Sequence, residues 1–260
     1  MAVGGVGVAT FVVPSTVSHI KPVAGGGGGA TLPVTAGLGA WYDADDPASF
    51  TYSSGNVVSQ WNDKSGLNRH LVQGTVAKQP TRSGTQNGHA TVATAVGQFM
   101  VTAQLSTDFT TGFSLFVVYK KTGTVQTNEA IPLMLASSSS PFSGPIEGYN
   151  ALRQLGCAGA SNSGSTISVA SQTSWNVLSA TGAPASTYFE YKDGAQVGTF
   201  AITAPSWPLG NQFITLASRT TGTSTQFVGE VGEGIAYNRV LTTTERQTIE
   251  GYLKAKWGTP

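Results

Sequence analysis

Charged residues are scarce in this chain. Asp, Glu, Lys and Arg make up 10% of its 260 residues, and the formal net charge is +1 at pH 7. An average soluble protein carries roughly 25% charged residues. No cluster of Lys and Arg is present, although the phosphates of a nucleic acid require one. The composition therefore argues against a nucleic-acid-binding protein.

Cysteine and long apolar runs are also nearly absent. Cys157 is the only cysteine, so no intrachain disulfide can form. No stretch approaches the roughly 18 apolar residues of a membrane helix. No Lys or Arg precedes Lys21, so the positive start of a secretory signal is missing. We expect a chain that neither crosses a membrane nor carries a secretory signal peptide.

Glycine is abundant, with 33 residues, and short apolar runs alternate with turn residues. This pattern is typical of an all-β protein. Asp193-Gly194 supplies the positive φ values of a tight hairpin turn inside residues 188–200. The Gly/Ser-rich residues 136–174 are expected to be mostly long loops. Four further runs are predicted strands: "VVSQW" (57–61), "FSLFVVYKK" (113–121), "FITLASR" (213–219) and "FVGEVGEGIAY" (227–237).

One helix is predicted, at the C-terminal end. Thr242 is followed three residues later by Glu245, which is the spacing of a capping box. An apolar stripe recurs every four residues and needs a surface to cover. Gly258 is expected to end the helix. The stripe consists of Ile249, Leu253 and Trp257.

A run of five glycines at residues 25–29 marks a boundary, because glycine runs behave as hinges. The segment "VGVATFVV" before it is uncharged and β-prone. We expect it to dock on another chain by adding a strand, with a disordered tail as the alternative. Its apolar centre is Phe11, Val12 and Val13. The predicted divisions are an arm at 1–24, a hinge at 25–31 and a main domain at 32–260.

Several stretches resemble a known family. "LGAWYDADDPASF" (38–50) and "GNVVSQWNDKSGLNRHLVQ" (55–73) are similar to the opening of concanavalin A-like, laminin G-like jelly-roll domains. The runs at 113–120 and 188–200 and the stretch 227–258 resemble the middle and closing strands of these domains. The resemblance implies a two-sheet antiparallel jelly-roll sandwich with one C-terminal α-helix. Such domains occur in tailed-phage virion proteins and in secreted bacterial sugar-binding modules.

Two carboxylates, Glu230 and Glu233, lie in an apolar strand, and glycosidases cut sugar bonds with a carboxylate pair. Strand side chains alternate, so residues three apart are expected to point to opposite faces. Glu233 then shares the row of Val231, Ile235 and Tyr237 and should be buried, paired with an Arg or with backbone donors. We interpret Glu233 as a structural residue.

A second acidic group is Asp43, Asp45 and Asp46, just before Pro47. Turn and cap chemistry is the preferred interpretation, because Pro47 ends the strand there. Oxygen-rich loops also bind calcium, so a calcium site is an alternative. A third alternative is an inverting glycosidase, because Asp43 and Asp45 are spaced by two and would share one face.

Aromatic residues on loops are candidates for stacking on sugars. Trp207 lies between two prolines, and Phe142 and Tyr149 lie in the Gly/Ser-rich region. The alternative for Trp207 is a core edge. In "WNDKSG", Trp61 is expected in the core and Asp63 in a tight turn. The histidines lie far apart without a partner at metal spacing, so no zinc site is expected.

Together these observations predict a non-enzymatic virion surface protein of a tailed phage, either a head-decoration or a fibre-type subunit. It would reach the virion surface after synthesis in the host cytoplasm. Its expected partners are other virion proteins, bound through the arm, and sister chains, with a trimer as the first expectation. A host-surface glycan is a further candidate partner, whereas nucleic acid and membrane are not. No cofactor is expected apart from the calcium alternative. The alternative function is a carbohydrate-binding lectin module of a bacterial surface or secreted protein.

Overall fold

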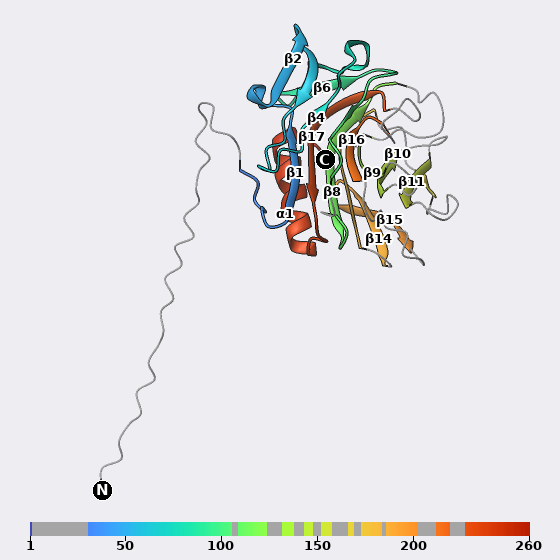
Figure 1. Cartoon of the computed structure of the whole chain (residues 1–260). Helices are drawn as coiled ribbons and strands as arrows, with labels where there is room; N and C mark the ends of the chain where they lie inside the picture. Colours follow the sequence, from blue (N-terminus) through green and yellow to red (C-terminus); the bar gives the residue numbers. More distant parts are fainter. Residues whose placement is uncertain are drawn as a thin grey trace. The chain divides into compact units, whose positions relative to one another are not determined.

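The structure is a computed structural model of the whole chain (Figure 1). Contacts divide the chain into two units, Met1–Ala30 and Thr31–Pro260. Within the first unit only Met1 is described, so the predicted arm residues Phe11, Val12 and Val13 lie outside the described residues. The second unit is described except at 106–108, 124–131, 138–142, 148–151, 158–165, 169–172, 184–185, 202–211 and 219–226.

The first sheet is antiparallel and has β17 at its centre. One edge of β17 pairs with β8 along its length, and the other edge pairs with β6 and then β1. The sheet continues from β8 through β13 and β14 to β15, and β5 pairs with β6. Its strands are β1 (Leu38–Asp43), β5 (Thr81–Gln86), β6 (His89–Thr94), β8 (Phe113–Lys121), β13 (Asn176–Gly182), β14 (Thr187–Lys192), β15 (Ala195–Ala201) and β17 (Gly229–Tyr237).

The second sheet runs in the order β2, β3, β4, β7, β16, β9, β10, β11, β12, and its ladders are also antiparallel. A single pairing of Val57 with Thr81 links it to the first sheet. Its strands are β2 (Phe50–Ser54), β3 (Val57–Trp61), β4 (Leu71–Val72), β7 (Met100–Val101), β9 (Leu133–Ser137), β10 (Ser143–Glu147), β11 (Leu152–Cys157), β12 (Thr166–Ser168) and β16 (Gln212–Leu216). The short 3-10 helices η1 (Pro47–Ser49) and η2 (Val76–Lys78) lie in its loops.

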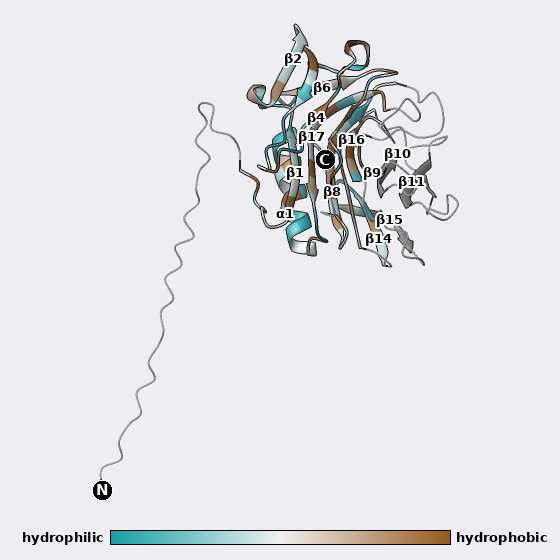
Figure 2. Cartoon of the chain, viewed as in Figure 1, coloured by the Kyte–Doolittle hydropathy of each residue, from teal (hydrophilic) through white to brown (hydrophobic). Residues whose placement is uncertain are grey.

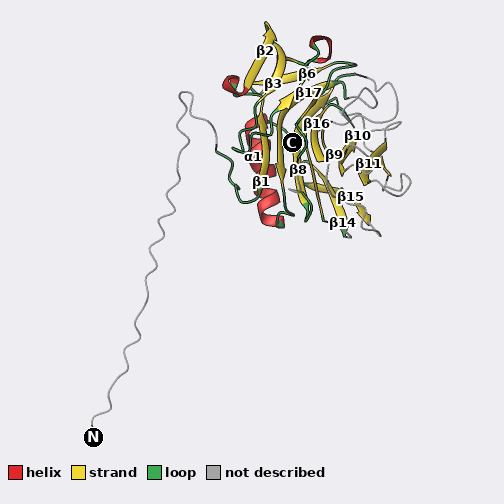
Figure 3. Cartoon of the chain, viewed as in Figure 1, coloured by secondary structure: helices red, strands yellow, loops and turns green. Residues whose placement is uncertain are grey.

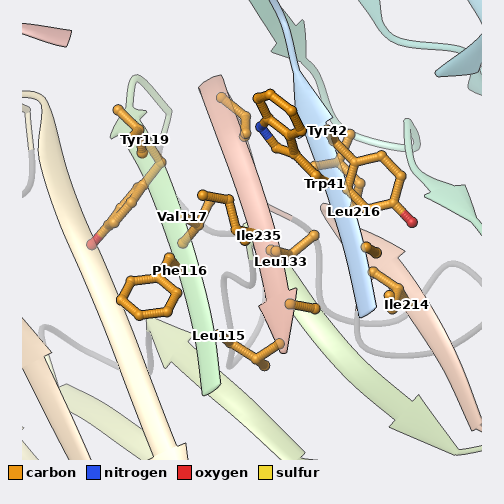
Figure 4. Close-up of a cluster of buried hydrophobic side chains, with 14 of the residues drawn as sticks. Trp41, Tyr42, Leu115, Phe116, Val117, Tyr119, Leu133, Ile214, Leu216 and Ile235 are labelled. Atoms are coloured by element: carbon orange, nitrogen blue, oxygen red, sulfur yellow. The ribbon is translucent and has the colours of Figure 1, made fainter. Parts of the chain in front are cut away.

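The main core lies between the two sheets. Figure 4 shows Val117 of β8 and Leu133 of β9 in this cluster, together with Ile214 and Leu216 of β16. All four side chains are almost fully buried, and burying one such side chain contributes about 1.5–3 kcal/mol. The two sheets approach each other closely at Gly234. A Cβ at this position would lie 3.1 Å from the Leu133 side chain. Figure 2 shows the hydrophobic colour along β8 and β9.

Helix α1 (Thr243–Trp257) covers the other face of the first sheet (Figure 3). Its N-terminus carries the predicted capping box between Thr242 and Glu245, and Gly258 follows it with a positive φ of 62°. The predicted stripe of Ile249, Leu253 and Trp257 is fully buried. The helix is therefore confirmed in its position, its caps and its buried face.

The prediction of an all-β sandwich with one C-terminal helix is confirmed. Within residues 136–174, which were expected to be mostly loops, the structure places the strands β10, β11 and β12, and much of the remainder lies outside the described residues. These strands pair through backbone groups, so a Gly/Ser-rich composition does not prevent them. In the described residues no helix is long and apolar enough to cross a membrane.

Candidate functional site

Two of the predicted acids, Asp43 of β1 and Glu233 of β17, lie on the helix-covered face of the first sheet. The Glu233 carboxylate is fully buried and accepts four hydrogen bonds. Two come from indoles, Trp41 Nε1 to Oε1 at 2.7 Å and Trp257 Nε1 to Oε2 at 2.9 Å. The others come from Tyr252 Oη to Oε1 at 3.1 Å and Lys256 Nζ to Oε2 at 2.9 Å. Burial is confirmed, but the expected Arg or backbone partner is wrong.

The prediction that Glu230 and Glu233 point to opposite faces is also wrong. The ladder pairs Val231 with Tyr119 and Glu233 with its neighbour Val118, so β17 has a bulge at the intervening residue. The bulge turns Glu233 away from the face of Val231 and onto that of Glu230. The two carboxylates nevertheless have different partners, because Glu230 accepts from the Thr91 hydroxyl at 2.7 Å.

The residue inside the bulge is Gly232, and the packing there requires a glycine. A Cβ at this position would lie 2.8 Å from the ring of Trp257, closer than real Cβ contacts come. The bulge therefore allows the last residue of α1 to lie directly on the strand. This contact places the Trp257 indole over the Glu233 carboxylate.

Lys256 joins the cluster to β1. Its Nζ lies 2.7 Å from Asp43 Oδ1 and 2.9 Å from Glu233 Oε2, and these two acids face each other in the β1–β17 ladder. Burial lowers the pKa of Lys256, but the two carboxylates outweigh burial and raise that pKa above its usual value. Burial raises the pKa of Glu233, against the pull of Lys256. One ammonium thus bridges two buried acids.

The three aspartates proposed for calcium do not converge on one point. Asp43 binds Lys64 and Lys256, and Asp46 binds Lys64 at 2.9 Å and caps η1 through the Ala48 N–H. Asp45 contacts His89 Nδ1 at 2.8 Å and accepts a hydrogen bond from the backbone N–H of Ala90. Among the described residues no group of three or more His, Cys, Asp or Glu could hold a metal ion. The arrangement of these three aspartates therefore gives no support to the calcium interpretation.

This cluster of Asp43, Glu233 and Lys256 joins helix α1 to β1 and β17. Asp43 and Glu233 are 4% and 0% exposed, which leaves no access for a sugar ring. Their oxygen atoms are already engaged by hydrogen-bond donors, as buried charges require. Burial and the neighbouring carboxylates raise the pKa of Tyr252, so its hydroxyl remains a donor to Glu233.

The "WNDKSG" stretch has the structure that was predicted. Trp61 is fully buried and stacks on Phe50 with ring centroids 5.2 Å apart. Asp63 accepts hydrogen bonds from the Trp41 and Ser65 backbone N–H groups, which closes the turn. The proposed sugar-stacking residues Trp207, Tyr149 and Phe142 lie outside the described residues.

Partly exposed side chains lie on a different surface, the face of the second sheet that points away from the core, although Thr215 on the same face is fully buried. The ladders place Gln60, Val72 and Val101 side by side in one row. Phe213 lies diagonally next to Val101, because Val101 pairs with Thr215 two residues along β16. Val72 is 39% exposed, and the other three are partly exposed. We call Gln60, Val72, Val101 and Phe213 the outer-face patch.

Reasoning from the sequence missed the outer-face patch and Lys256. Each patch residue comes from a different strand, and a row across strands appears only once the register is known. Lys256 lies 213 residues after Asp43 in the sequence, and no local pattern links the two. The sequence signal that could have identified Lys256 is its position directly before Trp257, the last residue of the apolar stripe of the helix.

Comparison with known proteins identifies the fold. No protein-family model matches the chain, and no curated protein sequence matches it. Trypanosoma rangeli sialidase, solved with sialic acid, is 17% identical with a TM-score of 0.59. That match covers 88% of this chain and 35% of the sialidase, so the chain spans about a third of the enzyme's length.

A second solved structure is matched over nearly all of its length. It is domain 4 of AbnA, a GH43 extracellular arabinanase from Geobacillus stearothermophilus, in complex with arabinotriose. The identity is 14% and the TM-score 0.57, and the match covers 82% of this chain and 98% of that domain. At these identities the likeness shows the fold alone. This chain therefore contains a jelly-roll β-sandwich, similar in fold to a discrete domain of an arabinanase and to part of a sialidase.

Proposed function

We propose that the chain is a carbohydrate-binding module that holds a glycan on the outer-face patch. The observation that carries this proposal is the asymmetry of the sandwich. Helix α1 and the acidic cluster occupy the outer face of the first sheet, whereas Val72 on the corresponding face of the second sheet is 39% exposed. Binding sites are mostly apolar surfaces with a few polar groups, and the patch combines Val72, Val101 and Phe213 with the amide of Gln60.

The fold comparison supports the same proposal. The arabinanase domain that matches this chain was solved in complex with arabinotriose, which shows that a sandwich of this shape can hold an oligosaccharide. The ring of Phe213 offers an apolar surface for the C–H face of a sugar. The side-chain oxygen of Gln60 is an acceptor for a sugar hydroxyl, since its nitrogen already donates to Asn62 at 2.7 Å.

The test is binding of the full chain to immobilised polysaccharides, measured by the retardation of the protein in gels that contain them. We expect retardation by at least one polysaccharide, and Phe213→Ala should weaken the affinity about tenfold, equivalent to ~1.4 kcal/mol. The matched control is Val76→Ala, which shortens an exposed side chain on η2. Equal affinity of Phe213→Ala and the wild type would show that the patch is not the site.

We also propose that the module is not an enzyme. Asp43 and Glu233 are paired acids in the β1–β17 ladder, and both are buried around Lys256. Incubation with the bound polysaccharide should release no reducing ends. Release that disappears in Asp45→Asn would overturn this proposal, because Asp45 is the more exposed of the two aspartates, Asp43 and Asp45, that have the spacing of a catalytic pair.

A second candidate is a virion surface subunit, and the arm sequence favours it. The uncharged "VGVATFVV" behind five glycines is suited to strand addition on a neighbouring chain. In this proposal the module would face outward from a phage particle and bind a host-surface glycan. Deletion of residues 1–29 should then leave glycan binding intact but abolish assembly with sister chains or attachment to the particle. Normal assembly of the truncated chain would contradict this candidate.

A further inference from the structure

One edge of β1 has no neighbouring strand. Among the described residues β1 pairs with β17 alone, along its other edge. An open strand edge presents backbone N–H and C=O groups that can pair with a strand from another chain. Such a strand is available in this protein, because residues 6–13 are uncharged and β-prone. The loop of residues 62–69, in the connection from β3 to β4, covers this edge, and we call it the strap.

The strap satisfies backbone groups of β1 that point away from β17. The Trp41 N–H donates to Asp63 Oδ1 at 2.9 Å, and the Trp41 carbonyl accepts from the Lys64 N–H at 2.8 Å. Two residues earlier in β1, the Gly39 carbonyl accepts from Arg69 Nη1 at 2.6 Å. A loop between two strands of the second sheet therefore takes the place of a neighbouring strand on the first sheet.

Asp63 holds the strap in its conformation. It is 8% exposed, and its carboxylate accepts four hydrogen bonds. Besides the Trp41 N–H, the donors are the Ser65 N–H at 2.8 Å, the Ser65 hydroxyl at 2.7 Å and the Arg69 N–H at 3.1 Å. Removal of a buried acceptor leaves its donors unsatisfied. Replacement of Asp63 should therefore loosen the strap and expose the Trp41 N–H, while the ladder between β1 and β17 stays in place.

Lys64 attaches the strap to β1 a second time, through its side chain. Its Nζ lies 3.2 Å from Asp43 Oδ2 and 2.9 Å from Asp46 Oδ2, and 4.4 Å from the centroid of the Trp41 ring. The same residue thus contacts β1 with its backbone at the edge and with its side chain on the face. These contacts show that the strap is fixed to this particular edge.

We propose that the strap guards the edge of β1 and prevents residues 6–13 of a second copy of this chain from adding to β1 as a strand. Strand addition works through main-chain hydrogen bonds, and the strap occupies the two that Trp41 could offer. Residues 6–13 carry no charge that would repel them from the edge, so the exclusion depends on the strap. The guard leaves the arm available for a different acceptor.

The test measures the molar mass of the full chain in solution by light scattering over a range of concentrations. Asp63→Ala should associate at concentrations about tenfold lower than the wild type, and Asp63→Asn, which keeps one acceptor oxygen, should lie between the two. Asp193→Ala is the matched control, because Asp193 also accepts a backbone N–H, that of Val177 at 2.8 Å, but in the turn between β14 and β15. It should associate no more than the wild type. Equal masses of Asp63→Ala and the wild type would overturn the proposal.

Two further substitutions test which strand is excluded. Ala9→Pro with Thr10→Pro removes one N–H from each edge of a strand formed by residues 6–13. Added to Asp63→Ala, they should restore the mass of the wild type, and association that persists would overturn the proposal. Hydrogen exchange of the Trp41 amide should be faster in Asp63→Ala, and an unchanged rate would overturn it as well. Far-UV circular dichroism checks the fold, and Asp63→Asn decides the outcome if Asp63→Ala does not fold.

Discussion

The two sheets of this sandwich use their outer faces in opposite ways. On the first sheet, Glu233, Asp43 and Lys256 form a buried charged cluster that α1 covers completely. On the second sheet, the strands β2, β3, β4, β7, β16 and β9 contain no charged residue, whereas β10 and β11 contain Glu147 and Arg153, and Val72 is 39% exposed. The difference teaches that buried charge holds the helix against the first sheet, whereas Val72 of the second sheet lies at the surface.

The largest effect is expected from removing the centre of the charged cluster. Glu233→Ala should lower the free energy of unfolding by about 3 kcal/mol, because Lys256 and two indole N–H groups lose a buried acceptor. Urea denaturation measures the loss. Glu230→Ala is the control, since Glu230 is only partly buried and accepts a hydrogen bond from the Thr91 hydroxyl. Similar losses in both variants would contradict the difference in role between the two glutamates.

A smaller effect is expected from filling the bulge that brings the helix onto the sheet. Gly232→Ala should lower the free energy of unfolding by about 1–3 kcal/mol, because the new Cβ would lie 2.8 Å from the Trp257 ring. Gly251→Ala is the control, because nothing lies within 4 Å of a Cβ at that helix position. It should raise the stability by about 0.5–1 kcal/mol. A neutral Gly232→Ala would show that the ring can move aside without loss.

Removing the N-terminal cap of α1 should lower the free energy of unfolding by about 1 kcal/mol. Thr242→Ala removes the acceptor of the Glu245 backbone N–H, and such caps contribute about that much. Thermal unfolding and far-UV circular dichroism measure the change. Thr244→Ala, in the first turn but outside the capping bonds, should leave the stability nearly unchanged.

The same cap predicts a dependence on pH. The Arg239 side chain and the Thr242 donors hold the pKa of Glu245 at about 2, below its ordinary value of 4.5. The cap therefore stabilises the fold above pH 4.5, and this contribution is lost as the pH falls toward 2. Stability of Glu245→Gln should change less over this range than that of the wild type. Parallel curves for the two proteins would contradict the assignment.

The smallest effect on stability is expected in the second sheet. Val72→Ala shortens a side chain that is 39% exposed, so the free energy of unfolding should change by no more than ~0.5 kcal/mol. Its effect on glycan affinity should nevertheless be measurable. A large loss of stability without any change in affinity would make the patch structural and remove the contrast between the sheets.

Much of the fold could be predicted because local rules decide it. The run at β8 is apolar on both faces, Asp193-Gly194 has the positive φ values of a hairpin turn, and Thr242 with Glu245 begins the helix. Burial of Glu233 also followed from its apolar neighbours. These features depend on residues that are close in the sequence.

The features that were not predicted depend on strand register and on contacts between residues that are far apart in the sequence. Alternation assumes an unbroken strand, so the bulge at Gly232 places Glu230 and Glu233 on the same face, contrary to the prediction, whereas Glu233 shares the row of Ile235 and Tyr237 as predicted. Lys256 was missed because its partners come from β1 and β17. The outer-face patch requires the register of four strands, and the strands of residues 143–168 pair through backbone atoms that the composition does not reveal.

The position of β17 in the first sheet has a consequence for the time course of folding. This strand is the last in the sequence, yet it lies between β8 on one edge and β1 and β6 on the other. A ribosome that has completed β1 must add nearly two hundred further residues before Glu233 can meet Asp43, at a pace of about 5–20 residues per second. Pairings so remote along the chain fold slowly. We expect the nascent chain to stay protease-sensitive until α1 has emerged, and to become resistant in one step.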